Sequence, residues 1–258
     1  MFFKKNFQIG VDIGSTAAKA IVLDEDGAIL YKAVIPTGWS SVGAAKELRE
    51  DMERSGIDVT ETRVVATGYG RVSVPYASKT VTEISCHAQG VFRLLGRDCT
   101  VVDIGGQDTK VISLSNGRVA GFLMNDKCAA GTGRFLEIMA NTLAVDLLGL
   151  FALAERGGGV TISAMCAVFA ESEVIGLIGS GRAKEDIAFA ICESIVTRVA
   201  ALCGKQGRGR EFFLSGGLYE SEYLRKRLSE RLQAPVTTDP LARWAGALGA
   251  AILAGRLD

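Results

Sequence analysis

The chain has no excess of charge of either sign, with 29 lysines and arginines against 29 aspartates and glutamates among its 258 residues. Nucleic acids and anionic membranes attract proteins through a basic surface, and a balanced sequence gives no sign of one. We therefore expect no nucleic-acid partner and no membrane partner. Partners should instead be selected by shape and local chemistry.

A long apolar run is also missing. The longest weakly polar stretch, residues 244–255, is too short to cross a bilayer and is typical of a small-residue packing helix. The first 14 residues have neither the apolar segment nor the small-residue cleavage site of a secretory signal. These absences predict a cytoplasmic protein.

Histidine is scarce, and no two cysteines are closely paired. The single histidine, His87, lies in a helical pattern and is expected to pack or hydrogen-bond rather than to catalyse. The six cysteines include no C-x₂-C pair, and a reducing compartment disfavours disulfides. We expect four of them to be plain structural thiols: Cys86, Cys99, Cys192 and Cys203.

The glycine-rich segment MNDKCAAGTGRFLEIMA, residues 124–140, lacks two familiar nucleotide signatures. It has no Lys-Ser/Thr ending of a P-loop, and Leu136 stands where a dinucleotide fingerprint has its third glycine. It does place Cys128 ahead of an amphipathic helical pattern. The cysteine is therefore the distinctive feature of this segment.

Two segments repeat one motif: VDIGSTAAKAIVL at 11–23 and VDIGGQDTKVISL at 102–114. Each continues into turn residues and another apolar run, so both copies predict three strands joined by tight turns. Helical patterns and two further strand-like runs follow, without a low-complexity linker. The predicted helices are 41–55, 83–95, 130–144, 166–180, 184–204, 218–232 and 241–254, and the strands 62–67 and 211–215. The sequence thus predicts two α/β halves of related topology that meet in a cleft.

The first turn of each repeat carries groups suited to a polyphosphate. A carboxylate at the end of the strand, Asp12 or Asp103, can hold a hydrated Mg²⁺ that bridges phosphates. Glycines permit the turn, hydroxyl and backbone N–H groups donate, and a lysine adds positive charge. The candidate phosphate-binding residues are Gly14, Ser15, Thr16, Lys19, Gly105 and Gly106. One such turn is explained as well by an exposed hairpin, but two copies with matched spacing favour a nucleotide site.

These hairpins resemble those of the ASKHA superfamily, which includes actin, sugar kinases and Hsp70 chaperones. The resemblance implies two RNase H-like half-domains, 1–96 and 97–258, that grip ATP from opposite sides of a cleft. It identifies FLSGGLYES, with Gly216 and Gly217, as the element that packs on adenosine. It also implies that the small-residue helix at 246–255 lets the halves cross closely and packs back on the first half.

The superfamily resemblance does not select a reaction. A sugar kinase usually carries a sugar-binding insertion and a base carboxylate near the second hairpin, where this chain offers Gln107 and Asp108. Actin-like proteins and chaperones carry subdomain insertions, for which little chain is left. A small-metabolite kinase and an ATP-switched binding module are the alternatives from other classes. For ATP hydrolysis, either Gln107 or Asp108 can position the attacking water.

Cys128 and Cys166 each come just ahead of a helical pattern, and Glu171 and Glu173 are interpreted as first-turn charges of the second helix. The partial positive charge of a helix N-terminus favours a thiolate. Four thiolates bind a [4Fe–4S] cluster or a tetrahedral zinc ion. Since one chain supplies two, a complete site requires two chains about a twofold axis. Two ordinary buried cysteines are the alternative.

The phrases NDKCAAGTGRFLE and CAVFAESEVI, together with both hairpins, closely resemble the activators of 2-hydroxyacyl-CoA dehydratases, also called component A. The resemblance runs from about residue 8 to the C-terminus. It implies a homodimer that holds one [4Fe–4S] cluster at its interface through Cys128 and Cys166 of each subunit. For Glu171 and Glu173, which lie in the second phrase, it implies a role near the nucleotide or the cluster as the alternative to plain helix charges.

ATP hydrolysis in such an activator drives a low-potential electron to a partner iron–sulfur enzyme, and a ferredoxin or flavodoxin is implied as the upstream donor. The acceptor expected first is a 2-hydroxyacyl-CoA dehydratase. Benzoyl-CoA-reductase-type and double-cubane-cluster proteins are the alternative acceptors. Because GTGRFLE joins the cluster cysteine to a helix near the nucleotide, closure of the cleft is expected to tilt helices about the cluster.

Overall fold

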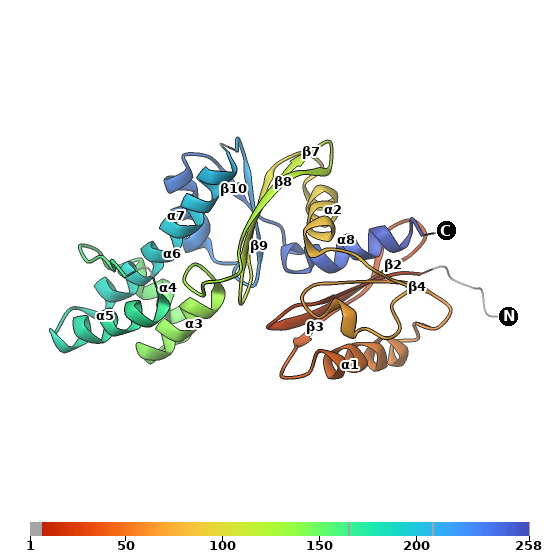
Figure 1. Ribbon diagram of the computed structural model, residues 1–258, viewed down its shortest axis with the longest axis horizontal. Helices are drawn as coiled ribbons and strands as arrows, with labels where there is room; N and C mark the ends of the chain where they lie inside the picture. Colours follow the sequence, from red (N-terminus) through yellow and green to blue (C-terminus); the bar gives the residue numbers. More distant parts are fainter. Residues whose placement is uncertain (1–6, 165, 208, 258) are drawn as a thin grey trace. The chain divides into compact units, whose positions relative to one another are not determined.

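A computed structural model describes residues 7–164, 166–207 and 209–257 and contains two five-stranded sheets with helices on their faces (Figure 1). The described residues form two compact units. Unit 1 draws on Met1–Asp98, Leu114–Ala120 and Leu241–Asp258, and unit 2 on Cys99–Ser113 and Gly121–Pro240. The division at residues 96 and 97 stays a prediction. Part of the segment read for a secretory signal, residues 1–6, lies outside the described residues.

The sheet of unit 1 has the strand order β3-β2-β1-β4-β5. Its strands are β1 (Gln8–Ile13), β2 (Ala17–Leu23), β3 (Ile29–Pro36), β4 (Arg63–Thr67) and β5 (Lys79–Thr80). β1 pairs antiparallel with β2 and parallel with β4. Because β1 is central and helices cover both faces, most of its residues are buried, as expected for a strand without alternation.

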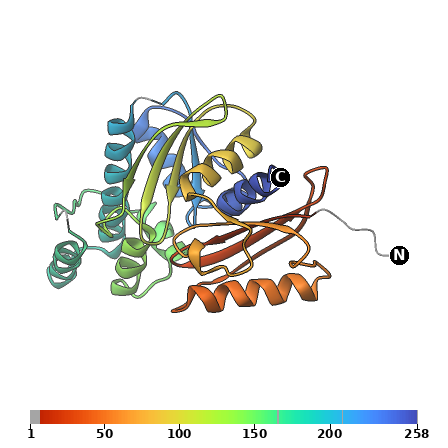
Figure 2. The ribbon, with the colours of Figure 1, turned by 45° about the vertical axis from the view of Figure 1, so that its right-hand side comes forward.

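Helices cover the two faces of this sheet with different side chains (Figure 2). α1 (Ser41–Arg54), capped by Ser40, packs Ala44, Leu48 and Met52 against one face. α8 (Ala245–Ala254) packs on the other face and along α2 (Glu83–Leu95), with short 3₁₀ turns at Arg71–Ser73 and Ala242–Trp244. Alternate residues of β2 face each layer, which is the period-2 pattern of a strand.

Glycines allow α8 to approach its neighbours closely. A Cβ added at Gly10 of β1 would stand 1.9 Å from the Ala247 oxygen, and one at Gly249 would stand 1.8 Å from the Cys86 oxygen. No side chain fits at such distances, so the small residues of α8 serve backbone-to-backbone packing.

The sheet of unit 2 repeats this plan in the order β10-β9-β6-β7-β8. Its strands are β6 (Thr100–Ile104), β7 (Thr109–Ser115), β8 (Arg118–Asn125), β9 (Phe212–Gly216) and β10 (Val236–Thr237). β6 pairs antiparallel with β7 and parallel with β9, as β1 does with β2 and β4. The predicted relation between the two α/β halves is confirmed.

The helices of unit 2 are α3 (Gly133–Thr142), α4 (Leu147–Ala154), α5 (Ala167–Gly179), α6 (Lys184–Gln206) and α7 (Glu222–Leu232). Within the described chain α6 alone is long and apolar enough to span a membrane, but 56% of its most apolar window is buried. α3 and α4 pass the same test only when taken as one span, and they are bent by 81°. α6 supplies much of the core of unit 2, which is what an apolar helix of a globular protein does.

The region predicted as one helix over 130–144 differs in the structure. α3 begins only at Gly133 because Gly131 has a φ of +99°, outside the helical region. The chain turns again at Ala144, with a φ of 50°, and Asp146 accepts a hydrogen bond from Gly149 N to cap α4. α4 and the two-residue strands β5 and β10 had no counterpart in the predicted elements.

Candidate functional site

The two repeated hairpins have the same local geometry. Gly14 N donates to Ala17 O at 3.1 Å, and Gly105 N donates to Asp108 O at 2.9 Å, so both turns close with one bond at the same spacing. A Cβ added at Gly14 would stand 2.8 Å from Ala17 O, and one at Gly105 would stand 2.6 Å from Asp108 Oδ1. The sequence repeat is therefore a repeat of tight backbone turns that require glycine.

Asp12 ends the strand of the first hairpin and is only 1% exposed. Lys19 Nζ lies 3.3 Å from its Oδ2, while Oδ1 has no hydrogen-bond partner among the described residues. Two glycines leave room around this carboxylate, since a Cβ at Gly68 would stand 2.4 Å from Oδ1 and one at Gly246 would stand 2.9 Å from Oδ2. A buried carboxylate oxygen without a partner suits a cation, because an unpaired buried charge is costly.

Asp103 occupies the equivalent place in the second hairpin and is 3% exposed. Ser215 Oγ donates to its Oδ1 at 2.9 Å. Lys110 Nζ lies 3.5 Å from its Oδ2 and 2.7 Å from Asp108 Oδ1. The buried lysine thus ties both carboxylates of this hairpin together and holds Asp108 in an ion pair.

The remaining hairpin residues are open to a ligand. Ser15, Thr16 and Gln107 are exposed, whereas Asp108 is partly buried. Thr37 Oγ1 donates to Gly14 O at 2.7 Å and fixes the turn from behind. Gln107 therefore keeps its amide available to solvent, while Asp108 is engaged by a lysine.

The strand beside each hairpin ends in a hydroxyl residue followed by a left-handed glycine. β4 ends at Thr67, and Gly68 directly after it has a φ of +87°. β9 ends with Ser215 and Gly216, and this glycine has a φ of +89°. A Cβ at Gly216 would stand 2.3 Å from the oxygen of Ile104. The structural repeat thus extends to Thr67, Gly68 and Ser215, which the sequence reasoning missed. The common Thr/Ser-Gly ending of the two strands was the available signal.

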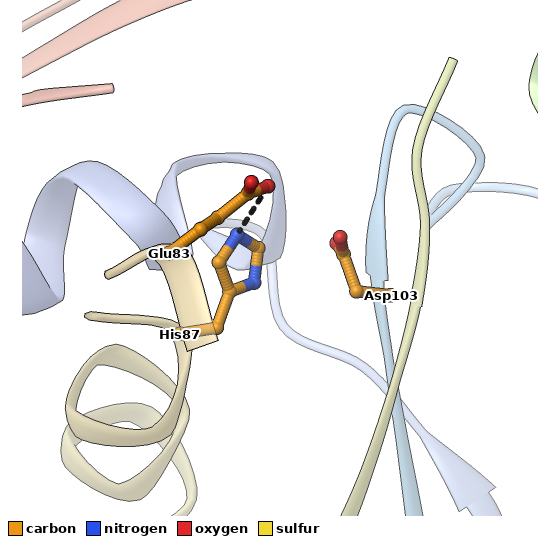
Figure 3. Close-up of side chains that lie close together, drawn as sticks. All are labelled: Glu83, His87 and Asp103. Atoms are coloured by element: carbon orange, nitrogen blue, oxygen red, sulfur yellow. Dashed lines mark ion pairs between the residues drawn. The ribbon is translucent and has the colours of Figure 1, made fainter. Parts of the chain in front are cut away.

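His87 lies on α2 with 4% exposure. Its Nε2 is 3.8 Å from Oε1 of Glu83, one turn earlier on the same helix (Figure 3). Asp103, also drawn in Figure 3, belongs to unit 2. The burial of His87 is consistent with the expected packing or hydrogen-bonding role, which stays a prediction.

The six cysteines divide into two groups by burial. Cys166 is exposed and is the N-cap of α5, and Cys128 is partly buried in the loop before α3, whose N-cap is Thr132. The other four are buried: Cys86, Cys99, Cys192 and Cys203. Burial raises the pKa of Cys86 and of Cys203 to about 12 and also raises the pKa of Cys192. The thiols of Cys86, Cys192 and Cys203 therefore stay protonated at neutral pH, and a protonated thiol is a poor metal ligand.

The loop that carries Cys128 is bonded to the second hairpin. Gly133 N donates to Gly105 O and Arg134 N donates to Gly106 O, both at 2.9 Å. Two of the free N–H groups at the start of α3 are thereby satisfied by hairpin carbonyls. The first turn of α3 and the second hairpin are therefore mechanically joined.

Glu171 and Glu173 do not lie in the first turn of α5, which contains no acidic residue. The interpretation of both as first-turn charges is therefore wrong, because α5 begins at Ala167 and its first turn ends before Glu171. The Glu173 carboxylate instead accepts from Ser163 N and Ala164 N, in the segment that leads to Cys166.

The two units with their repeated Asp-Gly hairpins define a protein of the ASKHA fold. A ROK family glucokinase from Streptomyces griseus shares this fold alone, with a TM-score of 0.62 at 17% identity over 98% of this chain and 100% of that chain. The profile of the BadF/BadG/BcrA/BcrD ATPase family matches residues 9–254, and the chain belongs to this family. It is therefore an ATP-binding and ATP-hydrolysing enzyme.

Two relatives within this family match along nearly the whole chain. The (R)-2-hydroxyglutaryl-CoA dehydratase activating ATPase of Acidaminococcus fermentans is 42% identical over 96% of each chain. The crystal structure of the component A from that organism has a TM-score of 0.91, at 41% identity over 97% of this chain and 98% of that chain. The activator of the 2-hydroxyisocaproyl-CoA dehydratase from Clostridium difficile, solved with bound ADPNP, has a TM-score of 0.89 at 38% identity, over 97% and 94% of the two chains.

Proposed function

We propose that this protein activates a 2-hydroxyacyl-CoA dehydratase by coupling ATP hydrolysis to the transfer of one low-potential electron. Two relatives that match along nearly the full chain are named as activators of such dehydratases. The observation that carries the proposal is the pair of hydrogen bonds from Gly133 and Arg134 to Gly105 and Gly106. These bonds join the second hairpin, which binds phosphate in this proposal, to the start of α3, the helix that follows the Cys128 loop.

In this proposal each hairpin contributes to Mg-ATP binding. Asp12 and Asp103 hold Mg²⁺, in keeping with the unpartnered and buried Oδ1 of Asp12. The phosphates are bound by Gly14, Ser15, Thr16, Lys19, Gly105 and Gly106, and Gly216 and Gly217 pack on adenosine. Lys19 also fixes the Asp12 carboxylate at 3.3 Å.

Gln107 is the proposed group that positions the attacking water. Its amide is exposed and can accept and donate at once. Asp108 is the weaker candidate because Lys110 holds its carboxylate at 2.7 Å. The water attacks the terminal phosphate and yields ADP and inorganic phosphate.

Cys128 and Cys166 are the proposed ligands of a [4Fe–4S] cluster. They fit as a donor set because they alone among the six cysteines are not buried, and both precede helices in one unit. A cluster bound there supplies one-electron transfer at low potential. The protein's part is to hold four thiolates, two from each chain, in fixed positions.

The exposed face of α5 supports a homodimer. Of its 13 residues only Ala170 and Val174 are buried. Apolar side chains on the rest of the helix are open, including Val168 at 67% and Phe169 at 69% exposure. Because α5 starts at Cys166, a second copy covering this helix would bring the two pairs of thiols together.

An electron donor and an acceptor complete the scheme. One electron enters from a ferredoxin or flavodoxin and leaves for an iron–sulfur centre of the dehydratase, so the activator returns to its starting state. We place this chemistry in the cytoplasm, where low-potential donors and acyl-CoA substrates are available.

Anaerobic purification followed by iron, sulfide and EPR analysis, with and without ATP, tests the proposal. A brown dimer with about four irons per two chains and an EPR signal that responds to ATP is expected. A colourless monomer that phosphorylates a small metabolite would instead support the kinase alternative. ATP hydrolysis alone, without iron, would support an ATP-switched binding module.

A further inference from the structure

Arg198 of α6 is close to two segments that carry the non-buried cysteines. The Cys128 segment is residues 128–131, and the Cys166 segment is residues 160–164 together with Cys166. Its Nη2 donates to Ala164 O at 2.7 Å, two residues before Cys166. Its aliphatic stem faces Gly131, three residues after Cys128, since a Cβ added at Gly131 would stand 3.4 Å from Arg198 Cβ and 3.6 Å from its Cδ. One side chain thus touches both segments.

The Cys128 segment is also held from the side of the sheet. Asn125 Nδ2 donates to Cys128 O at 3.0 Å and to Ala130 O at 3.2 Å. Thr109 Oγ1 donates to Gly131 O at 2.6 Å. Side chains of β7 and β8 therefore fix one side of this loop, and the Arg198 stem supports the other.

Residues 160–164, which lead towards Cys166, belong to no helix or strand, so their backbone groups depend on side chains. The Glu173 carboxylate accepts from Ser163 N and Ala164 N at 3.0 to 3.1 Å, and Arg198 donates to Ala164 O. Both N–H groups of Ser163 and Ala164 and the Ala164 carbonyl are thus satisfied by side chains, as backbone groups require.

Packing and hydrogen bonds act together on this segment, since Ile162 and Ala164 are partly buried against the core of unit 2. Residues 160–163 line an open pocket of about 370 Å³, together with Ser194, Thr197 and Arg198 of α6. Arg198 Nε lies 3.4 Å from Ser194 Oγ, which orients the guanidinium on its helix. The hydrogen bonds of Arg198 and Glu173 are the polar restraints on the backbone just ahead of Cys166.

We propose that Arg198 is a positioning residue that fixes the spacing of Cys128 and Cys166 within each chain, with Glu173 as its counterpart on α5. The inference rests on the proposed function, in which both thiols bind one cluster. Groups that orient metal ligands without touching the metal control how firmly the metal is held. Arginine suits this place because its stem packs on the glycine turn while its planar head binds a carbonyl.

The test compares Arg198→Met with Arg231→Met in the full-length protein. Methionine keeps an apolar stem beside Gly131 but cannot donate to Ala164. Arg231 borders the same pocket and donates to Thr197 Oγ1 at 2.6 Å. Its described hydrogen bonds and ion pairs involve neither cysteine segment, which makes it the matched control.

Both variants and the wild type are reconstituted anaerobically with iron and sulfide, and iron release to a chelator is then followed together with the EPR spectrum of the reduced protein. We expect Arg198→Met to lose iron about tenfold faster or more, with a broadened EPR signal. Its ATP affinity and thermal unfolding should match those of Arg231→Met. Arg198→Lys should be intermediate, because it keeps one donor and loses the fork.

An Arg198→Met protein that holds iron as firmly as Arg231→Met would overturn the inference. If Arg198→Met does not fold, then Arg198→Lys and Glu173→Gln decide, and wild-type iron release in both would overturn it as well. A wild type that takes up no iron and sulfide would refute the proposed function, and the inference would fail with it. If the wild type holds a stable cluster and Arg198→Met releases iron at the wild-type rate, the inference is refuted and the proposed function stands.

Discussion

The backbone N–H of Gly133 donates to the carbonyl of Gly105 at 2.9 Å, so the first turn of α3 is bonded to the second of the two repeated hairpins. Arg134 makes the neighbouring bond to Gly106. A change in that hairpin when the terminal phosphate leaves must stretch these bonds or move α3. A packed element responds to such a change by shifting as a body.

Asp103→Ala should lower ATP hydrolysis by at least about 100-fold, because the Mg²⁺ that stabilises the transferring phosphoryl group loses its carboxylate. Iron content should stay at the wild-type value, since neither cysteine segment contacts Asp103 in the described hydrogen bonds. Phosphate release and iron analysis measure both. Asp26→Ala, in an exposed turn, is the control. Loss of iron together with hydrolysis would indicate misfolding rather than a magnesium ligand.

Gln107→Ala should slow hydrolysis by about 100-fold without weakening ATP binding, because the side chain acts on the water rather than on the nucleotide. Binding of a non-hydrolysable ATP analogue, measured by calorimetry, separates the two effects. Asp108→Asn is the comparison, and it should cost less. Hydrolysis at the wild-type rate in Gln107→Ala would transfer the role to Asp108.

Cys128→Ser and Cys166→Ser should each remove the whole cluster, because one substitution deletes two of the four thiolates of a dimer. The dimer should weaken, and ATP binding should remain. Cys86→Ala, Cys99→Ala, Cys192→Ala and Cys203→Ala should keep full iron content, with stability losses of about 1 kcal/mol. Iron analysis measures the cluster content, and gel filtration measures the fraction of dimer. A normal [4Fe–4S] EPR signal in Cys128→Ser would contradict the ligand assignment.

Gly216→Ala and Gly217→Ala should differ sharply in folding stability, although the two residues are neighbours. Gly216 has a φ of +89° and no room for a Cβ, so alanine there should cost about 1–3 kcal/mol of folding stability. A Cβ at Gly217 would meet nothing within 4 Å, so Gly217→Ala should fold as the wild type does. If Gly217 lies against adenosine as proposed, its variant should still lose ATP affinity. Thermal unfolding and ATP titration separate these effects.

The free energy of unfolding should fall as the pH rises from about 9 towards 12. Burial raises the pKa of Cys86 and of Cys203 from 9.0 to about 12, so the unfolded chain ionises these thiols first while the folded chain keeps them protonated. The stability they contribute is complete below pH 9 and is lost as the pH approaches their folded pKa. Denaturant unfolding at several pH values measures the slope. The double variant Cys86→Ala, Cys203→Ala should show a flatter profile, and an equal slope would exclude these thiols as the cause.

The two repeated hairpins could be predicted because their signals are local. The repeat from Asp12 to Lys19 and from Asp103 to Lys110 becomes cross-strand pairs in identical register. Ser215 could not be assigned to Asp103 in the same way, because their pairing joins strands more than 100 residues apart. Long-range parallel pairing leaves little trace in a short sequence window.

α4 was missed for a different reason. Residues 147–154 carry only apolar side chains and a glycine, so no helical period marks them as an amphipathic helix. The left-handed turn at Ala144 and the cap at Asp146 decide the boundary, and alanine gives no warning of a positive φ. Similarly, Glu173 was read as a helix charge because its partners, Ser163 and Ala164, precede the helix in an irregular segment.

The close packing of α8 on β1 and α2, which glycines permit, affects how the chain folds during its synthesis. Strand β1 leaves the ribosome long before α8, the helix that covers one face of its sheet, which follows about 230 residues later. Such non-local closure is slow. Unit 2 is nearly continuous in sequence and is complete before α8 emerges. During synthesis Ile21 and Leu23 therefore wait without their partners on α8, and a nascent chain that stalls before residue 245 presents an apolar sheet to chaperones and to other unfinished chains.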